Sequence, residues 1–341
     1  MFNPKVIRIL AEKYAPTFKK LSQVETLLNQ RFANIEKTVR ALILSIASGE
    51  PMLLIGPPGT GKSRLIRAFC GITGLLDEDD PTRDHQDYFE YLLTPFTEPG
   101  ELFGFYDIRS AMEEKELKRI DKNMMQNARI VYLDEVFNGS SAILNSLLAF
   151  LNERIFHDRS LRKPVAMECL FGATNFIPET PELKAVFDRF LIRSYMENVE
   201  SEPEKISQLI RKGWKETFSF HPKFNEFNKL LDELKAFRDT IKSITAKGHL
   251  IPDETGEFYR GITQLIHYSR QYELSEMSNR RLVKMVFIMM IDRIYKAVIS
   301  DEYKQEGEIK MSSVQLELLP LYFLDRQDEE AQRQMIAAAG F

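Results

Sequence analysis

The chain has 341 residues, of which 44% are hydrophobic and 28% charged, and its formal net charge is −4. This composition is ordinary for a soluble globular protein with room for two domains and a sizeable core. The acidic balance gives no reason to expect a nucleic-acid binder held by a global positive field, although it leaves room for a local basic stripe in an assembled ring.

The N-terminal 48 residues are predicted to be helical, because apolar residues recur from Val24 to Ile46 with a spacing close to 3.6. The first four residues are followed by a mixed and charged sequence, which is not typical of a signal peptide. No apolar run approaches the roughly 18 residues that a membrane-spanning helix needs. We therefore expect no membrane segment and a cytoplasmic location.

Short apolar runs alternate with helical patterns between residues 51 and 195. This alternation predicts an α/β domain in which helices cover both faces of a parallel sheet. The predicted strands are residues 51–55, 88–93, 128–133, 168–173 and 190–195. The predicted helices are residues 62–72 and 140–152, and the second should bury Ile143, Leu144, Leu147, Leu148 and Leu151.

From about residue 200 the pattern becomes almost wholly helical. The predicted helices are residues 203–217, 223–243, 260–272, 279–299 and 328–338. A loop is predicted over residues 246–257, which contain two glycines and a proline. We therefore expect an α/β domain over residues 1–200 and a helical domain over residues 201–341.

A glycine-rich sequence, GPPGTGKS, occupies residues 56–63 between a predicted strand and a predicted helix. It matches the phosphate-binding P-loop pattern completely, and this context makes the match specific. Glycines allow the backbone N–H groups to converge on phosphate oxygens, and the helix N-terminus adds partial positive charge. The lysine adds a full charge, and the serine hydroxyl is a ligand for Mg²⁺. The predicted nucleotide-binding residues are Gly56, Pro57, Pro58, Gly59, Thr60, Gly61, Lys62, Ser63 and Arg64.

Two adjacent carboxylates, Asp134 and Glu135, end the predicted strand 128–133. A buried parallel strand delivers its C-terminal end to the ligand crevice of the sheet. Asp134 is therefore predicted to bind nucleotide and to hold Mg²⁺, directly or through water. Glu135 is predicted to polarise the attacking water. The alternative is a strand that simply ends in two solvated acids.

Three further polar residues are candidates for catalysis: Asn175, Arg189 and Arg280. Asn175 follows a predicted strand and would orient water without neutralising the phosphate, although an Asn is also common in turns. Arg189 would reach the γ-phosphate of a neighbouring subunit as an arginine finger, with Arg193 as the alternative. Arg280 would contact phosphate from the helical domain, with Arg281 as the alternative. For each arginine, a salt bridge or solvated position remains the simpler interpretation.

With these residues in place, the chain resembles the MoxR family of AAA+ ATPases, in particular its RavA-like branch, over roughly residues 20–300. The most specific match is LDEVFNGSSAILNSLLAFLNERIFHD over residues 133–158, which contains the Walker B strand, an AILN-LL helix and an NER-F ending. The sequences EPGELFGFYDI (98–108) and FDRFLIRSY (187–195) also match.

The resemblance implies an αβα core with a five-stranded parallel sheet in the order 5-1-4-3-2 and a C-terminal α-helical lid domain. It also implies ATP and Mg²⁺ as cofactors and a homo-oligomeric, hexameric ring with ATP at the subunit interfaces. In its terms, the site residues are Lys62 in Walker A, Asp134 and Glu135 in Walker B, Asn175 as sensor 1, Arg189 as the arginine finger and Arg280 as sensor 2. Members commonly act as chaperone-like remodellers beside a partner with a von Willebrand factor A domain.

Two features depart from the RavA-type pattern. The chain ends soon after the lid, so we expect the extra C-terminal domains of longer RavA-type proteins to be missing. Residues 77–87, DEDDPTRDHQD, are also unusually acidic. This stretch is predicted to be a solvated loop or, alternatively, a docking surface for a basic partner.

ATP-driven remodelling of a protein client is the function that these features favour. The aromatic residues Phe103, Phe105 and Tyr106 are candidate client contacts, or alternatively a packed aromatic hairpin. A nucleotide-dependent assembly switch or scaffold with slow hydrolysis is the main alternative. A nucleic-acid-stimulated motor is disfavoured by the acidic composition, and a P-loop kinase is disfavoured because an acid pair with Asn175 suits water activation.

Overall fold

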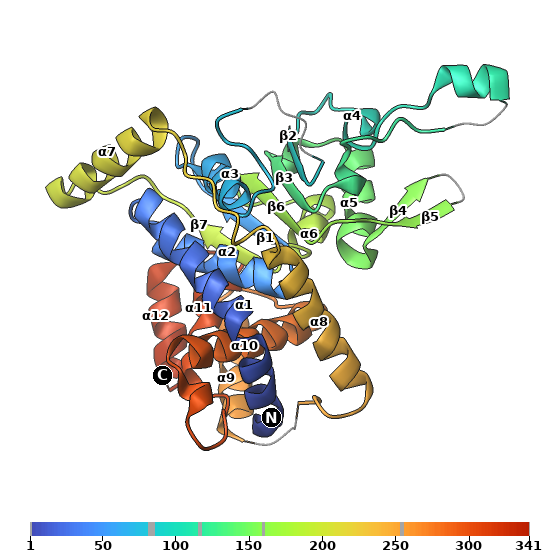
Figure 1. Cartoon of the computed structure of the whole chain (residues 1–341). Helices are drawn as coiled ribbons and strands as arrows, with labels where there is room; N and C mark the ends of the chain where they lie inside the picture. The colour runs from blue at the N-terminus through green and yellow to red at the C-terminus, as the bar shows by residue number, and fades with distance from the viewer. Residues whose placement is uncertain (1, 81–85, 115–117, 159–160, 253–255, 341) are drawn as a thin grey trace. The chain divides into compact units, whose positions relative to one another are not determined.

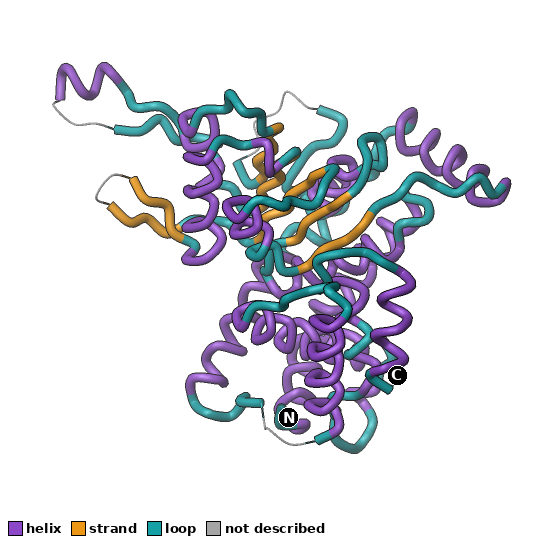
Figure 2. The backbone as a smooth tube through the Cα atoms, turned by 180° about the vertical axis from the view of Figure 1, so that it is seen from behind, coloured by secondary structure: helices purple, strands orange, loops and turns teal. Residues whose placement is uncertain are grey.

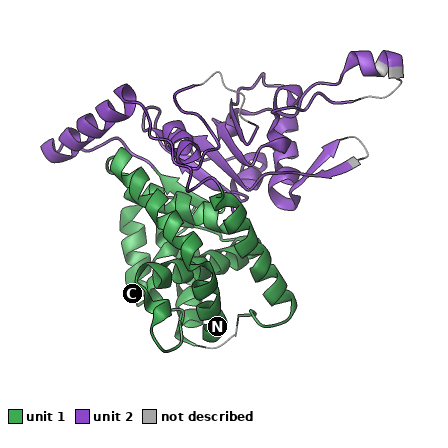
Figure 3. Ribbon diagram, viewed as in Figure 1, with its two compact units in different colours: residues 1–49, 191–195, 229–341 green, residues 50–190, 196–228 purple. Residues whose placement is uncertain are grey.

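The structure is a computed structural model that describes residues 2–80, 86–114, 118–158, 161–252 and 256–340 (Figure 1). The chain is α/β, with a five-stranded parallel sheet and a helical C-terminal region, as predicted. It divides into two compact units (Figure 3). Unit 1 contains residues 1–49, 191–195 and 229–341, and unit 2 contains residues 50–190 and 196–228.

The sheet has the strand order β2-β3-β6-β1-β7. Its strands are β1 (Met52–Ile55), β2 (Tyr88–Leu92), β3 (Ile130–Asp134), β6 (Cys169–Thr174) and β7 (Ile192–Tyr195). If the five strands are numbered 1 to 5 along the chain, leaving out the separate β4–β5 hairpin, the order read from β7 is 5-1-4-3-2, as predicted. The described pairings of β1 with β6, β3 with β6, and β2 with β3 are parallel. Figure 2 shows these strands side by side and the hairpin apart from them.

The central strands are predictable because they are buried on both faces. Every residue of β1 and β6 is buried, and β3 is buried up to Asp134. Such strands have nearly continuous apolar sequences, which stand out between glycine-rich turns. The predicted boundaries of these three strands therefore lie within one or two residues of the observed ones.

Unit 2 also contains short elements that the sequence analysis did not predict. These are α4 (Pro99–Phe103), α6 (Pro181–Phe187), the β4 (Ile155–Asp158) and β5 (Leu161–Pro164) hairpin, the π-helix η1 (Ser110–Glu114), and the 3₁₀ turns η2 (Met125–Asn127) and η3 (Val136–Asn138). The predicted helices are α3 (Lys62–Ile72), α5 (Ser141–Glu153) and α7 (Pro203–Phe218). In α5 the buried stripe includes Phe150, whereas Leu148 lies at its half-buried edge.

Unit 1 is helical apart from β7. Its helices are α1 (Pro4–Arg31), α2 (Glu36–Ser48), α8 (Leu230–Ala246), α9 (Glu257–Gln271), α10 (Asn279–Ile299), α11 (Leu318–Tyr322) and α12 (Glu329–Ala338), with 3₁₀ turns η4 (Glu302–Lys304) and η5 (Ser313–Gln315). Residues 253–255 of the predicted loop lie outside the described residues. In the described part of the chain, no helix is long and apolar enough to cross a membrane.

The two compact units do not follow the division expected at residue 200. The N-terminal helices belong to unit 1 because their apolar face packs on C-terminal helices. The Phe18 ring of α1 lies 5.0 Å from the Phe237 ring of α8 and 6.2 Å from the Tyr295 ring of α10. Arg40 of α2 forms an ion pair with the fully buried Asp292 of α10. These contacts join residues that are far apart in the sequence.

Candidate nucleotide site

Three neighbouring strands bring the predicted site residues to one edge of the sheet. Strand β6 lies between β1 and β3, with Ile55 of β1 opposite Thr174 and Leu133 of β3 opposite Gly172. The N–H of Gly56 donates to the carbonyl of Thr174 at 3.0 Å, so the glycine loop begins where β6 ends. In parallel strands the carboxyl ends share an edge. The loop after β1, the acids of β3 and the residues after β6 therefore meet at this edge.

The glycine loop is open around two of its glycines. Gly59 and Gly61 have φ angles of +85° and +87°, which is the left-handed region that favours glycine. A Cβ atom at either position would meet nothing within 4 Å. Gly56 differs, because a Cβ there would lie only 2.0 Å from the carbonyl oxygen of Met196. The loop therefore needs glycine for its backbone angles at two positions and for close packing at a third.

Helix α3 begins at Lys62 with its N-terminal amides uncapped by a side chain and with no acid in its first turn. This end of the helix is favourable for an anion. The Lys62 side chain is buried, and its Nζ donates to the carbonyls of Gly56 and Pro57 at 2.8 and 2.9 Å. Burial lowers the pKa of Lys62, while the Asp134 and Glu135 carboxylates oppose that change. The ammonium group thus interacts with both the loop and the acid pair.

Glu135 is held in a strained conformation beside Asp134. Its φ of 49° lies in the left-handed region, and its N–H donates to Oδ1 of Asp134 at 3.0 Å. Burial raises the pKa of Glu135 and Asp134 raises it further, whereas Lys62 opposes the change. Within the described residues, its Oε2 atom is buried and has no hydrogen-bond partner. A buried carboxylate oxygen of this kind requires a hydrogen-bond donor such as water. The water molecule that Glu135 is predicted to polarise would be such a donor.

The open loop, the lysine and the unpartnered carboxylate oxygen fit a bound nucleoside triphosphate. The Ser63 hydroxyl and the Asp134 carboxylate are the oxygen donors present for Mg²⁺. Thr60 shapes the loop by donating from Oγ1 to the Pro57 carbonyl at 3.0 Å. Pro58 is exposed at the tip of the loop. Asn175 is exposed directly after β6.

Arg64 makes a contact that the sequence analysis did not anticipate. Its Nη2 donates to the backbone carbonyl of Glu216 at 2.6 Å, and its Nε lies 3.6 Å from the Glu216 carboxylate. Glu216 is buried near the end of α7, which is otherwise exposed along most of its length. The arginine of the P-loop helix is therefore directed to α7 in this structure. A glutamate so far along the chain carries no signal in the sequence that links it to the P-loop.

The two candidate arginine fingers have different surroundings. Arg189 follows α6, and its Nη1 donates to the Ala185 carbonyl and to Asp188, both at 3.3 Å. Arg193 is fully buried in β7 and pairs with Asp325. Burial lowers the pKa of Arg193 to about 9, with a further contribution from Arg281. A side chain enclosed in this way is not available to a neighbouring subunit.

The two candidate lid arginines differ in the same way. Arg281 is buried and donates from Nη1 to the Asp325 carboxylate at 2.6 Å. Arg280 precedes it on the first turn of α10 and is exposed. Arg280 belongs to unit 1, whereas the other residues predicted for the site belong to unit 2.

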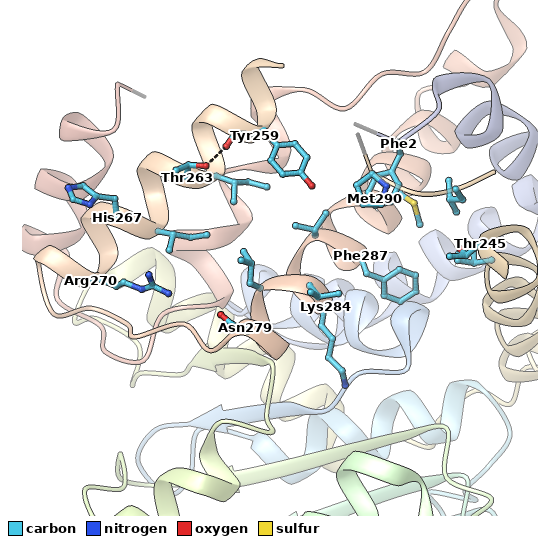
Figure 4. Close-up of a pocket in the computed structure, with 18 of the residues that line it drawn as sticks. Phe2, Thr245, Tyr259, Thr263, His267, Arg270, Asn279, Lys284, Phe287 and Met290 are labelled. Atoms are coloured by element: carbon cyan, nitrogen blue, oxygen red, sulfur yellow. Dashed lines mark hydrogen bonds between the residues drawn. The ribbon is translucent and has the colours of Figure 1, made fainter. Parts of the chain in front are cut away.

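A cavity of about 1180 Å³ lies within unit 1, between α8, α9 and α10 (Figure 4). Its lining is mostly apolar and includes Phe2, Phe287 and Met290, with Arg270 and Lys284 among the polar residues. The residues of the described chain that line it include no carboxylate and no glycine loop. Its chemistry therefore differs from that of the predicted nucleotide site in unit 2.

Residues 19–238 match the family model of the MoxR domain in the MoxR-vWA-beta-propeller ternary systems. Two uncharacterized proteins of Methanocaldococcus jannaschii are 36% and 35% identical over 190 and 192 residues, which is 56% of this chain in both cases and 48% and 47% of those proteins. A structural protein of Acidianus two-tailed virus is 25% identical over 210 residues, or 59% of this chain and 33% of that protein. The chain thus spans about half the length, or less, of these curated relatives.

The fold is shared with a candidate ATPase of Cytophaga hutchinsonii, whose crystal structure matches with a TM-score of 0.63 at 15% identity. This likeness covers 98% of this chain and 96% of the other, and at such low identity it concerns the fold alone. The family match covers more than half of the sequence, including the glycine loop and the acid pair. The chain therefore belongs to the MoxR family of AAA+ ATPases.

Proposed function

We propose that the protein binds ATP at residues 56–64 and hydrolyses it with Glu135 as the residue that polarises water. The observation that carries this proposal is the buried, unpartnered Oε2 of Glu135, which lies on the strand edge that also carries the open glycine loop. A carboxylate with one free oxygen can accept a proton from a water molecule. An exposed acid pair at a strand end would leave no such unsatisfied atom.

Different residues of the chain have different roles in the proposed phosphoryl transfer to water. Lys62 exchanges its two hydrogen bonds to loop carbonyls for bonds to phosphate oxygens, and the α3 amides stabilise the same charge. Ser63 and Asp134 would hold Mg²⁺, which neutralises charge on the phosphates when bound. Glu135 directs the attacking water, and Asn175 orients it without adding charge. Arg189 acts from a neighbouring subunit, and Arg280 acts from α10 in the C-terminal helical lid.

In this proposal, ATP hydrolysis drives a conformational change. Loss of the γ-phosphate removes the contacts of Asn175, Arg189 and Arg280, and this shifts the equilibrium between lid and subunit arrangements. The protein belongs to the RavA-like branch and assembles into a homo-oligomeric, hexameric ring in the cytoplasm. This ring remodels a protein client, and nucleic acid has no role in its activity. The family description names a vWA component, which supports a partner with a von Willebrand factor A domain.

Phe105 is the aromatic residue best placed to contact a client. It is 57% exposed, whereas Phe103 is buried and stacks on Phe156 with ring centroids 4.9 Å apart. Tyr106 donates to Asp158 at 3.0 Å and lies under the Arg119 guanidinium at 4.2 Å. The packed-hairpin alternative therefore describes Phe103 and Tyr106, and only Phe105 remains a candidate.

Two substitutions test the nucleotide site. Lys62→Ala should remove binding of a fluorescent ATP analogue, because it deletes the only lysine in the loop. Glu135→Gln should retain binding and lose hydrolysis by roughly 10²-fold or more, since proton transfer by a positioned side chain contributes about that much. Glu153→Gln, an exposed glutamate at the end of α5, is the matched control and should be unaffected. Undiminished hydrolysis by the Glu135→Gln protein contradicts the proposal.

A further inference from the structure

A second cluster of ligand-type side chains lies in unit 2, apart from the acid pair. Glu78 follows α3, Glu216 lies near the end of α7, and His221 follows α7. One ligand atom from each residue lies within 4.8 Å of the other two. Glu216 is 7% exposed, and the other two side chains are half-buried. Two carboxylates and an imidazole are thus gathered where water only partly reaches them.

The hydrogen bonds of His221 show which side of its ring faces the carboxylates. Its Nδ1 lies 3.0 Å from Oδ1 of Asp79, and its own backbone N–H donates to the same carboxylate at 3.2 Å. Since a carboxylate accepts hydrogen bonds, Nδ1 carries the proton. The opposite atom, Nε2, faces the backbone carbonyl of Glu216 at 3.2 Å and its carboxylate at 3.5 Å. Both ring nitrogens therefore face acceptors, an arrangement that requires either a proton on each nitrogen or a cation beside Nε2.

We propose that Glu78, Glu216 and His221 bind one divalent transition-metal ion of the zinc type. One nitrogen and two carboxylate oxygens suit zinc, whereas Mg²⁺ prefers oxygen ligands alone. Ligands at about 2.0–2.2 Å from zinc lie roughly 3–3.6 Å apart, which is within reach of these side chains by small rotations. Asp79 supplies the carboxylate that metal-binding histidines usually have as a hydrogen-bond partner on their other nitrogen.

A polar cavity gives access to this site, and the site includes acids of the stretch 77–87. Glu78 and His221 line a polar cavity of about 530 Å³. Asp77 pairs with Lys223 at 2.7 Å, so the start of the stretch is bound to the segment after α7. Residues 81–85 lie outside the described residues. In the described part, Asp77 and Asp79 thus pair with Lys223 and His221 of the same unit, and these pairings favour a metal site over a docking surface for a basic partner.

Arg64 connects the proposed metal site with the glycine loop. It is the third residue of α3 and contacts Glu216, one of the proposed ligands. A bound cation and the Arg64 guanidinium share the same carboxylate, so metal binding weakens the attraction of Arg64 to it. The metal site itself does not depend on ATP hydrolysis, because none of its ligands belongs to the predicted catalytic set.

The test is calorimetric titration of the full, chelator-treated chain with Zn²⁺ in the absence of nucleotide. We expect one equivalent to bind, with at least about tenfold weaker binding to His221→Ala and Glu78→Gln. Asp79→Asn should weaken binding by about 10- to 100-fold, since it removes the carboxylate that holds Nδ1 of His221. His249→Ala is the matched control, because His249 is exposed and lies in unit 1. Circular dichroism verifies that each variant is folded.

Co²⁺ provides an independent probe. Its visible absorption should appear with one equivalent in the native protein and in the His249→Ala variant, and it should be reduced in Glu78→Gln, a comparison that does not require His221→Ala to fold. Equal Zn²⁺ affinity in the native protein and in Glu78→Gln overturns the proposal. So does the absence of Zn²⁺ binding, in which case a proton on Nε2 of His221 accounts for its contact with Glu216. Lys62→Ala should lose nucleotide binding but keep the Zn²⁺ titration, so the two proposals fail separately.

Discussion

Replacement of Asp325 by asparagine should strongly destabilise unit 1. The Asp325 carboxylate accepts hydrogen bonds from two buried guanidinium groups, those of Arg193 and Arg281, and from the Ser275 hydroxyl at 2.8 Å. The side chains of the two arginines are 0% and 3% exposed. Although burial alone would raise the pKa of Asp325, the two arginines lower it below its ordinary value. The carboxylate is therefore ionised and offsets two buried positive charges.

The magnitude follows from the cost of leaving a buried charge uncompensated. Removing one partner of a buried ion pair costs about 3–5 kcal/mol. Because the Asp325 side chain is 25% exposed, water screens part of the interaction, and we expect about 3 kcal/mol, near the lower limit. For a unit of this size, each kcal/mol lowers Tm by roughly 2–4 °C. The predicted decrease is therefore about 6–12 °C by differential scanning calorimetry.

Two controls separate this charge effect from a general loss of polar contacts. Asp239→Asn removes an exposed ion pair with Lys242 and should change the free energy of unfolding by less than about 0.5 kcal/mol. Arg193→Met added to Asp325→Asn removes one uncompensated charge and should restore part of the lost stability. If Asp325→Asn and Asp239→Asn have equal Tm values, or the second substitution lowers Tm further, the argument from buried charge is wrong.

The remaining predictions concern the phosphate loop, α7 and the acid pair. Gly56→Ala should abolish ATP binding, measured with a fluorescent analogue, because its Cβ would lie 2.0 Å from the Met196 carbonyl oxygen. Gly213→Ala, with open space around its Cβ in α7, should instead raise the free energy of unfolding by about 0.5–1 kcal/mol in urea titrations; a loss of stability would contradict this. Because burial and Asp134 raise the pKa of Glu135, and only the ionised form polarises water, the hydrolysis rate should fall with decreasing pH at values above the ordinary glutamate range. An acid limb of the pH–rate profile that persists in Glu135→Gln would exclude Glu135 as its origin.

Local rules were sufficient to predict the sheet and the glycine loop. The sequence of β1 is continuously apolar, and it is followed at once by glycines and Lys62, so the strand, the turn and the helix start are all visible within a dozen or so residues. The same is true of β3 and its two acids. Each of these features depends on neighbouring residues and on the rule that parallel strands end at a common edge.

Long-range contacts could not be predicted in this way. Periodicity shows that α1 has an apolar face, but it does not show that Phe18 meets Phe237 and Tyr295. For the same reason, the position of Arg193 as the fourth residue of a predicted strand does not reveal that it is buried against Asp325. The hairpin β4–β5 was missed because its strands have only four residues each and contain charged side chains.

The close contact between Gly56 and Met196 joins two segments that are distant in the sequence. The Met196 N–H donates to the Ile55 carbonyl at 2.7 Å, and its own carbonyl oxygen lies against the Gly56 backbone. The chain that leads to α7 is thus fastened at the first residue of the phosphate loop. A displacement of the segment that leads to α7 would therefore also displace the first residue of the glycine loop, because the two are joined at this contact.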